Sequence, residues 1–155
     1  MENSKQKILI TGASSGLGRE LAHQYAQKGN VELILVARRK EALEKVAKKC
    51  EAFENVKTRV YSVDIGSQEQ VEHLLSSVKD IDILINGAGY GIMKDFSEFS
   101  DHDVVNMFDT NVIGTIQLTT EIAKRMREKK IWNYRNYSFS SRKNSYTKEF
   151  CLFSN

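Results

Sequence analysis

A glycine-rich turn near the N-terminus constrains the fold of this chain more than any other feature. The apolar run Lys7–Thr11 has the composition of a buried strand, and an amphipathic pattern typical of a helix runs from Gly16 to about Lys28. Between the two, residues 11–18 read Thr-Gly-Ala-Ser-Ser-Gly-Leu-Gly. Glycine tolerates backbone conformations that other residues avoid, and it allows a helix to pack closely on its neighbours. The sequence therefore predicts a strand, a tight turn and a helix in direct succession.

Short apolar segments alternate with amphipathic segments through the first 130 residues. Strands are also expected at residues 31–37, 57–63 and 82–86, and helices at 40–53, 67–78 (capped by Ser67) and 101–128 (interrupted or bent near Gly114). Continuously apolar strands separated by helices of about 10–15 residues are typical of a parallel sheet covered on both faces. The predicted fold class is therefore α/β, with a doubly wound parallel sheet over residues 1–130 and a distinct tail over residues 131–155.

Composition and charge limit the classes of protein that the chain can belong to. No stretch approaches the ~20 consecutive apolar residues of a membrane span, and the first residues lack the layout of a signal peptide. We therefore expect a cytoplasmic protein without membrane contact. Residues 1–130 hold 19 basic and 19 acidic side chains, so the net charge of +3 comes from the tail, and no nucleic-acid partner is expected. The two cysteines and three histidines are scattered, and no metal site is expected.

The glycine-rich turn also has the chemistry of a phosphate site, because free N–H groups and the helix dipole favour an anion at a helix N-terminus. Gly12 permits the tight turn, Gly16 lets the backbone approach a pyrophosphate, and Gly18 lets the helix pack closely on the strand. The spacing differs from the commoner G-x-G-x-x-G, and glycines often only form turns, but the strand–turn–helix context favours a dinucleotide site. The candidate cofactor residues of this turn are Gly12, Ser14, Ser15, Gly16, Leu17 and Gly18.

The end of the second expected strand distinguishes between the two nicotinamide dinucleotides. A carboxylate at this place binds the ribose 2′-hydroxyl of NAD, whereas an arginine suits the 2′-phosphate of NADP. Here Ala37 is followed by Arg38 and Arg39, and no acidic residue is present. Guanidinium groups are permanently charged donors that match phosphate oxygens. We therefore expect NADP rather than NAD; the alternative is a pair of solvated arginines at the start of a helix.

At this point the chain resembles the short-chain dehydrogenase/reductase family over residues 5 to about 130. Beside the turn, the similarity rests on Asp64 after the third strand, on the sequence N-G-A-G at residues 86–89, where the family has N-N-A-G, and on Asn111 in the long helix. The resemblance implies a Rossmann-like NAD(P)-binding sheet, truncated here after about four or five strands. It also assigns roles to further residues. By this resemblance, Asp64 and Ile65 would contact the adenine. Asn86, Ala88 and Gly89 would line the cofactor site, and Asn111 would hold a water molecule of the proton relay.

The chemistry of the family is hydride transfer between the nicotinamide and a carbonyl or alcohol. It uses a tyrosine as general acid/base, a lysine four positions later that lowers the tyrosine pKa, and a serine thirteen positions before the tyrosine. The tail contains Ser140, Ser141, Tyr146 and Lys148. Tyr146 and Lys148, however, are two apart and would lie about 200° from each other on a helix, and no four-residue Tyr–Lys spacing occurs in residues 131–155.

We therefore expect an NADP-dependent oxidoreductase by family, acting on a small carbonyl or alcohol, whose chain as given is inactive. Family members usually form dimers or tetramers, so a homo-oligomer is the expected assembly. The alternative is a non-catalytic NADP-binding module whose tail serves a partner.

Residues 131–155 have the composition of a segment translated out of frame. They contain no Gly, Ala or Val, and seven of the 25 are aromatic, against seven in the preceding 130. Back-translation of Trp132–Asn155 with one permitted set of codons, read one nucleotide later, gives GIIEIIASAAGKIPIPKNFAYSA followed by Thr. This sequence holds a strand, a serine and a tyrosine thirteen positions after that serine. We interpret the tail as the product of a frameshift near Lys130; the alternative is a genuine variant extension.

Overall fold

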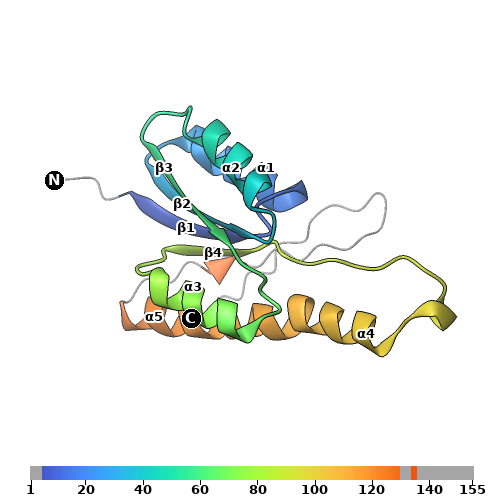
Figure 1. The fold of residues 1–155 in the computed structure, drawn as a ribbon. Coiled ribbons are helices and arrows are strands. Elements are labelled where there is room, and N and C mark those ends of the chain that lie inside the picture. Colours follow the sequence, from blue (N-terminus) through green and yellow to red (C-terminus); the bar gives the residue numbers. More distant parts are fainter. Residues whose placement is uncertain (1–4, 130–133, 136–155) are drawn as a thin grey trace.

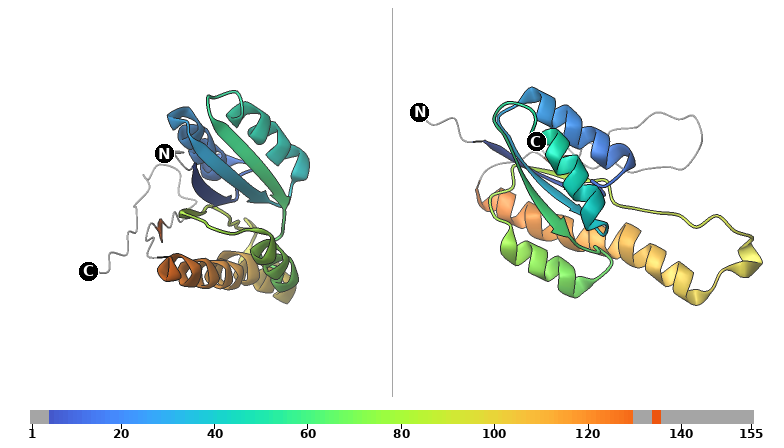
Figure 2. Two further views of the ribbon diagram at one scale, coloured as in Figure 1. Left: turned by 90° about the vertical axis from the view of Figure 1, so that its left-hand side faces the viewer. Right: turned by 45° about the horizontal axis from the view of Figure 1, so that its top comes forward.

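The fold is a parallel sheet covered by helices on both faces, as Figures 1 and 2 show for the computed structural model, which describes residues 5–129 and 134–135. The strand order is β3-β2-β1-β4-β5, and every pairing is parallel. The strands are β1 (Gln6–Thr11), β2 (Val31–Ala37), β3 (Val56–Ser62), β4 (Ile83–Asn86) and β5 (Tyr134–Arg135). The predicted α/β class and the doubly wound topology are therefore confirmed.

The helices form two layers with the sheet between them (Figure 2, left). One layer contains α1 (Gly16–Lys28) and α2 (Lys40–Cys50). The other contains α3 (Gln68–Ser77) and a long helical run made of α4 (Asp101–Phe108), η2 (Asp109–Gly114) and α5 (Thr115–Glu128), preceded by a short 3-10 helix, η1 (Phe96–Glu98). Among the described residues, no helix combines the length and the apolar character needed to cross a membrane.

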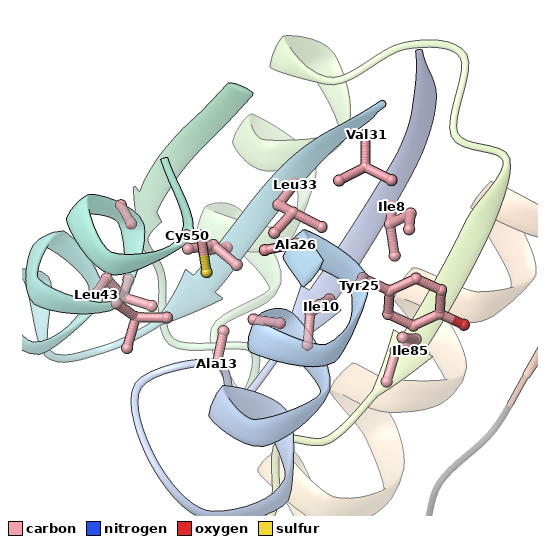
Figure 3. Close-up of a cluster of buried hydrophobic side chains, with 14 of the residues drawn as sticks. Ile8, Ile10, Ala13, Tyr25, Ala26, Val31, Leu33, Leu43, Cys50 and Ile85 are labelled. Atoms are coloured by element: carbon pink, nitrogen blue, oxygen red, sulfur yellow. The ribbon is translucent and has the colours of Figure 1, made fainter. Parts of the chain in front are cut away.

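Two buried clusters hold these layers together, and alternation along the strands divides the residues between them. In β1, Ile8 and Ile10 belong to the cluster that also contains Tyr25 of α1 and Leu43 of α2 (Figure 3), whereas Leu9 belongs to the cluster formed with α3 and α5. β2 and β4 alternate in the same way. A strand buried on both faces needs apolar residues at every position, which explains the continuous apolar runs in the sequence.

The predicted helix over 101–128 is confirmed in extent, and the interruption expected near Gly114 is a π-helix in its middle. Gly114 ends that π-helix, and a side chain at this position would overlap the carbonyl oxygen of Ile65 in the loop after β3. The helix can therefore approach the loop only because residue 114 is a glycine. Wide turns of this kind are frequent at functional sites, and here the π-helix carries Asn111.

The N-termini of two helices have defined caps. The predicted cap of α3 is confirmed, since the Ser67 side chain accepts a hydrogen bond from the Gln70 N–H. Ser100 and Asp103 form a capping box at the start of α4. Hydrogen bonds from Lys94 and Ser100 hold the pKa of the Asp103 carboxyl well below its usual range. These contacts also fasten the loop that contains Lys94 to α4.

The bounds of the other elements differ from the predicted bounds by few residues. α1 and β2 match the prediction, and α2 ends at Cys50 rather than at Phe53, because residues 51–54 form turns and a bend. β4 is followed across the sheet by β5, in which Tyr134 pairs with Leu84 and Arg135 with Ile85. The tail therefore contributes a short fifth strand beside β4.

Substitution of Gly114 tests the close approach of the helix to the loop after β3. We expect Gly114→Ala to lower the free energy of unfolding by about 2 kcal/mol, because overpacking of about 3 kcal/mol outweighs a helix-propensity gain of about 1 kcal/mol. Gly91→Ala is the control, since a Cβ at this loop position meets no atom within 4 Å. Urea unfolding measures both, and equal stabilities of the two variants would contradict this packing.

Candidate functional site

The candidate site lies where the loops after β1 and β4 touch, at the carboxyl ends of the strands. Thr11, the last residue of β1, is fully buried, and its hydroxyl oxygen accepts hydrogen bonds from the backbone N–H of Gly87 at 3.2 Å and of Ala88 at 3.1 Å. A Cβ on Gly12 would overlap the carbonyl oxygen of Gly87. In doubly wound sheets ligands bind in the crevice at this edge, where the strand order reverses beside the first strand.

The three glycines of the turn have different roles. Gly12 has a φ of +68° and no room for a side chain, so it serves both the turn and the contact between the loops. A Cβ on Gly18 would lie 2.5 Å from the Gly12 carbonyl oxygen, so Gly18 packs on the turn itself rather than on the strand as predicted. Gly16 has a φ of +54°, and a Cβ there meets no atom within 4 Å. Its backbone therefore faces open space.

The start of α1 suits an anion. Ser15 is the N-cap, but its side chain makes no capping hydrogen bond, and the first turn of the helix contains no acidic residue. The first N–H groups of a helix have no partner within the helix, and at this turn the N-cap side chain does not supply one. Together with the open space over Gly16, these donors fit the pyrophosphate of a dinucleotide.

A cavity of about 260 Å³ extends from this turn across the ends of β2 and β3 to the loop after β4. Of the predicted site residues, the structure brings these together around the cavity: Gly12, Ser14, Ser15, Arg38, Arg39, Asp64, Ile65, Ala88 and Gly89. The predicted residues outside its lining are Gly16, Leu17, Gly18, Asn86 and Asn111. The lining residues that sequence reasoning missed are Val36, Ala37, Val63, Tyr90 and Thr110.

The far end of the cavity is basic. Arg39 donates a hydrogen bond from Nη2 to Ser14 Oγ at 3.3 Å, which links the end of β2 to the glycine-rich turn. Arg38 Nη1 lies 4.0 Å from Asp64 Oδ2, and the guanidinium carbon of Arg38 lies 5.4 Å from the centre of the Tyr90 ring. Asp64 Oδ1 also accepts the Gly66 N–H at 3.0 Å, so this carboxylate stabilises the turn after β3 as well. This end of the cavity therefore holds two guanidinium groups and one carboxylate, and the carboxylate pairs with Arg38.

The two asparagines implied by the family resemblance contact neighbouring elements. Asn86 is buried at the end of β4, and its Nδ2 donates to Thr119 Oγ1 on α5 at 2.9 Å. Asn111 donates from Nδ2 to the Tyr90 carbonyl oxygen at 2.7 Å and accepts the Tyr90 N–H on Oδ1 at 2.9 Å. The side chain of Asn111 therefore fastens the loop after β4 to the π-helix.

One Tyr-x-x-x-Lys spacing occurs among the described residues, from Tyr90 to Lys94, with Ser77 thirteen positions before the tyrosine. These residues do not form a catalytic group. Tyr90 and Lys94 lie in a non-helical loop, so the spacing does not place them on one helix face. Lys94 pairs with Asp103, and Ser77 at the end of α3 donates to the His73 carbonyl oxygen. The serines, Tyr146 and Lys148 of the tail lie outside the described residues.

The cysteine within the described residues is structural. Cys50 is buried at the end of α2, with its Sγ 3.9 Å from His23 Nδ1. Burial, and to a smaller extent the nearby Glu51, raises the pKa of the thiol to about 11, so the thiol is protonated at neutral pH. Within residues 5–129 and 134–135, no group of three or more His, Cys, Asp or Glu side chains could hold a metal ion.

Comparison with known proteins agrees with this geometry. A sequence model of the short chain dehydrogenase family matches residues 6–131. The NADP-dependent 3-hydroxy acid dehydrogenase of Schizosaccharomyces pombe is 36% identical over 120 residues, which cover 74% of this chain and 46% of that protein. Human retinol dehydrogenase 8 is 33% identical over 136 residues, 84% of this chain and 43% of that protein. The chain thus spans about half the length of the curated relatives it matches.

Solved structures show the same similarity. A short-chain dehydrogenase from Sphingobium yanoikuyae, solved in complex with NADPH, matches with a TM-score of 0.77 at 28% identity, over 84% of this chain and 52% of that one. An alcohol dehydrogenase specific for bulky-bulky ketones, from Comamonas testosteroni, matches with a TM-score of 0.79 at 26% identity, over 86% of this chain and 55% of that one.

The glycine roles can be separated by stability measurements. We expect Gly12→Ala to lower the free energy of unfolding by about 3 kcal/mol or more, because a Cβ overlaps the Gly87 carbonyl and the φ is positive. Gly16→Ala carries only the positive-φ cost of about 1 kcal/mol. Urea unfolding compares the two, and a larger loss for Gly16→Ala would refute this assignment.

Proposed function

Because the chain belongs to the short-chain dehydrogenase family, we propose that its crevice binds NADP(H) and that it derives from an oxidoreductase acting on a carbonyl or alcohol. The observation that carries this proposal is one cavity that joins an uncapped helix N-terminus to two guanidinium groups. An NADP-dependent relative and an NADPH-bound neighbour support the same cofactor. When bound, the dinucleotide would supply or receive the hydride.

Different residues would bind different parts of the cofactor along the cavity. The backbone N–H groups of Ser15, which lines the cavity, and of Gly16 and Leu17, which follow it at the rim, would bind the pyrophosphate. Arg38 and Arg39 would bind the 2′-phosphate as charged donors, and Asp64 and Ile65 would contact the adenine. Ala88 and Gly89 would line the middle of the cofactor, where small residues let the backbone approach.

Asn86, Gly18 and Asn111 would position these groups from outside the cavity. Asn86 connects β4 to α5, and Gly18 packs α1 on the turn. The Asn111 side chain holds the Tyr90 backbone. We propose that Asn111 also holds a water of the proton relay in the intact enzyme.

We further propose that the catalytic residues for hydride transfer are encoded in the other reading frame. Among the described residues, serines and Tyr90 line the cavity but no lysine does, so no catalytic Ser, Tyr and Lys group forms there, and the chain as given would bind cofactor without turnover. In the shifted frame the strand GIIEII occupies positions 132–137. The observed β5, Tyr134–Arg135, falls inside that stretch and pairs with β4. The position of β5 beside β4 supports the proposal that the shifted frame encodes the fifth strand of the family fold at this place, followed by the serine and the tyrosine.

Cofactor preference tests the binding proposal. We expect NADPH to bind more tightly than NADH, and Arg39→Met to weaken NADPH binding by about tenfold or more, since a charged hydrogen bond contributes about 1.5–3 kcal/mol. NADH binding should change little in the same variant. Lys40→Met is the control, because Lys40 lies on the exposed face of α2 and, among the described residues, pairs with Glu44. Calorimetric titration measures each affinity, and equal or tighter NADH binding by the unchanged protein would overturn the preference for NADP.

Sequencing and reframing of the gene test the proposed division of the chain. We expect turnover at background level for the chain as given, with NADPH and a panel of small aldehydes and ketones, and measurable turnover once the frame is shifted near the codon of Lys130. Stop codons in the shifted frame, or the absence of a Tyr-x-x-x-Lys in it, would contradict the frameshift. A measured rate in the chain as given would contradict its inactivity.

A further inference from the structure

An aromatic side chain and a cation face each other across the cavity. Tyr90 belongs to the loop after β4, and Arg38 follows β2, so the two residues come from strands that are separated by β1. The guanidinium carbon of Arg38 lies 5.4 Å from the Tyr90 ring centre, within the range of a cation–π contact. Both residues line the cavity. The contact therefore connects the two sides of the candidate cofactor site.

The position of Tyr90 is fixed by the fold. Its N–H and carbonyl groups both bond to the Asn111 side chain, at 2.9 and 2.7 Å. Asn111 in turn lies close against Gly89, where an added Cβ would come within 3.2 Å of Asn111 Oδ1. The backbone that carries the Tyr90 ring is therefore held by the π-helix, and these backbone contacts do not depend on the ring.

Arg38 is held less firmly. Its side chain is 60% exposed, and its pairing with Asp64 is at the long distance of 4.0 Å. Exposed ion pairs of this kind contribute little, because water screens the charges and two flexible side chains must be ordered. The direction of the Arg38 guanidinium therefore depends on the Tyr90 ring together with Asp64.

We propose that Tyr90 is a positioning residue for nucleotide binding and that it acts through Arg38. This inference rests on the proposed NADP(H) site. The Tyr90 ring holds the guanidinium over the adenine end of the cavity, and a planar guanidinium can stack on an aromatic face while its edge N–H groups serve a phosphate. If the guanidinium is already ordered in the free protein, less conformational entropy is lost when the nucleotide binds. Tyr90 thus raises affinity without being a catalytic residue.

The test uses two nucleotide fragments that would occupy only the adenine end of the cavity. They are 2′,5′-ADP, which carries the 2′-phosphate, and 5′-AMP, which lacks it. We expect Tyr90→Leu to weaken 2′,5′-ADP binding roughly two- to fivefold, as the strength of an exposed cation–π contact implies. Tyr90→Phe keeps the ring and should bind like the unchanged protein. In an Arg38→Met background, Tyr90→Leu should change nothing further, because the residue through which it acts is gone.

The double-variant cycle separates this role from others. If Tyr90→Leu weakens binding equally with and without Arg38, then Tyr90 contacts the nucleotide itself and the proposal is wrong. It is also wrong if Tyr90→Leu leaves the affinity unchanged, or if Tyr90→Phe loses as much as Tyr90→Leu. If the unchanged protein binds neither fragment, the proposed NADP(H) site fails first, and this inference fails with it.

A second measurement needs no variant and covers the case in which Tyr90→Leu does not fold. The Tyr90 ring should shift the Arg38 Nε–H proton resonance of the unchanged protein through its ring current. An Arg38 side-chain signal at its ordinary position would overturn the proposed contact.

Discussion

The contact between the loops after β1 and β4 is the constraint on which the site depends. The Thr11 hydroxyl accepts two N–H groups of the β4 loop, and Gly12 and Gly87 lie so close that a side chain on Gly12 does not fit. This contact fixes the turn before α1 relative to the loop that carries Tyr90. The uncapped start of α1 and the arginines after β2 then face one cavity rather than two separate surfaces.

The sequence predicts most of this fold because its signals are local. Apolar runs and helical periodicity place the strands and helices within a few residues, and the glycine-rich turn and the arginine pair are contiguous motifs. An interruption of the long helix near Gly114 is predicted, but its π-helical form at residues 109–114 is not, because these residues keep a helical pattern and the close contact of Gly114 with the Ile65 carbonyl joins residues far apart in sequence. Tyr90 escapes prediction for the same reason: its partners Arg38 and Asn111 are far away in sequence.

We propose that cofactor binding and the chemical reaction depend on different parts of the family fold. The described residues form the part of the family fold that we propose binds the cofactor, and the chain spans about half the length of its curated relatives. The part that we propose to carry out the reaction begins near Lys130, where the composition changes and where the proposed shifted frame would encode a strand, a serine and a tyrosine. β5 lies at this junction, beside β4.

The most direct test of the cofactor crevice is a map of backbone amide shifts on titration with NADPH, recorded by ¹⁵N–¹H correlation spectroscopy on the chain as it exists. We expect saturable changes that are largest at residues 12–18 and at Gly89. Changes confined to the groove between α3 and α5, which Leu75 and Ile116 line, or no change in a folded protein, would contradict the proposed crevice.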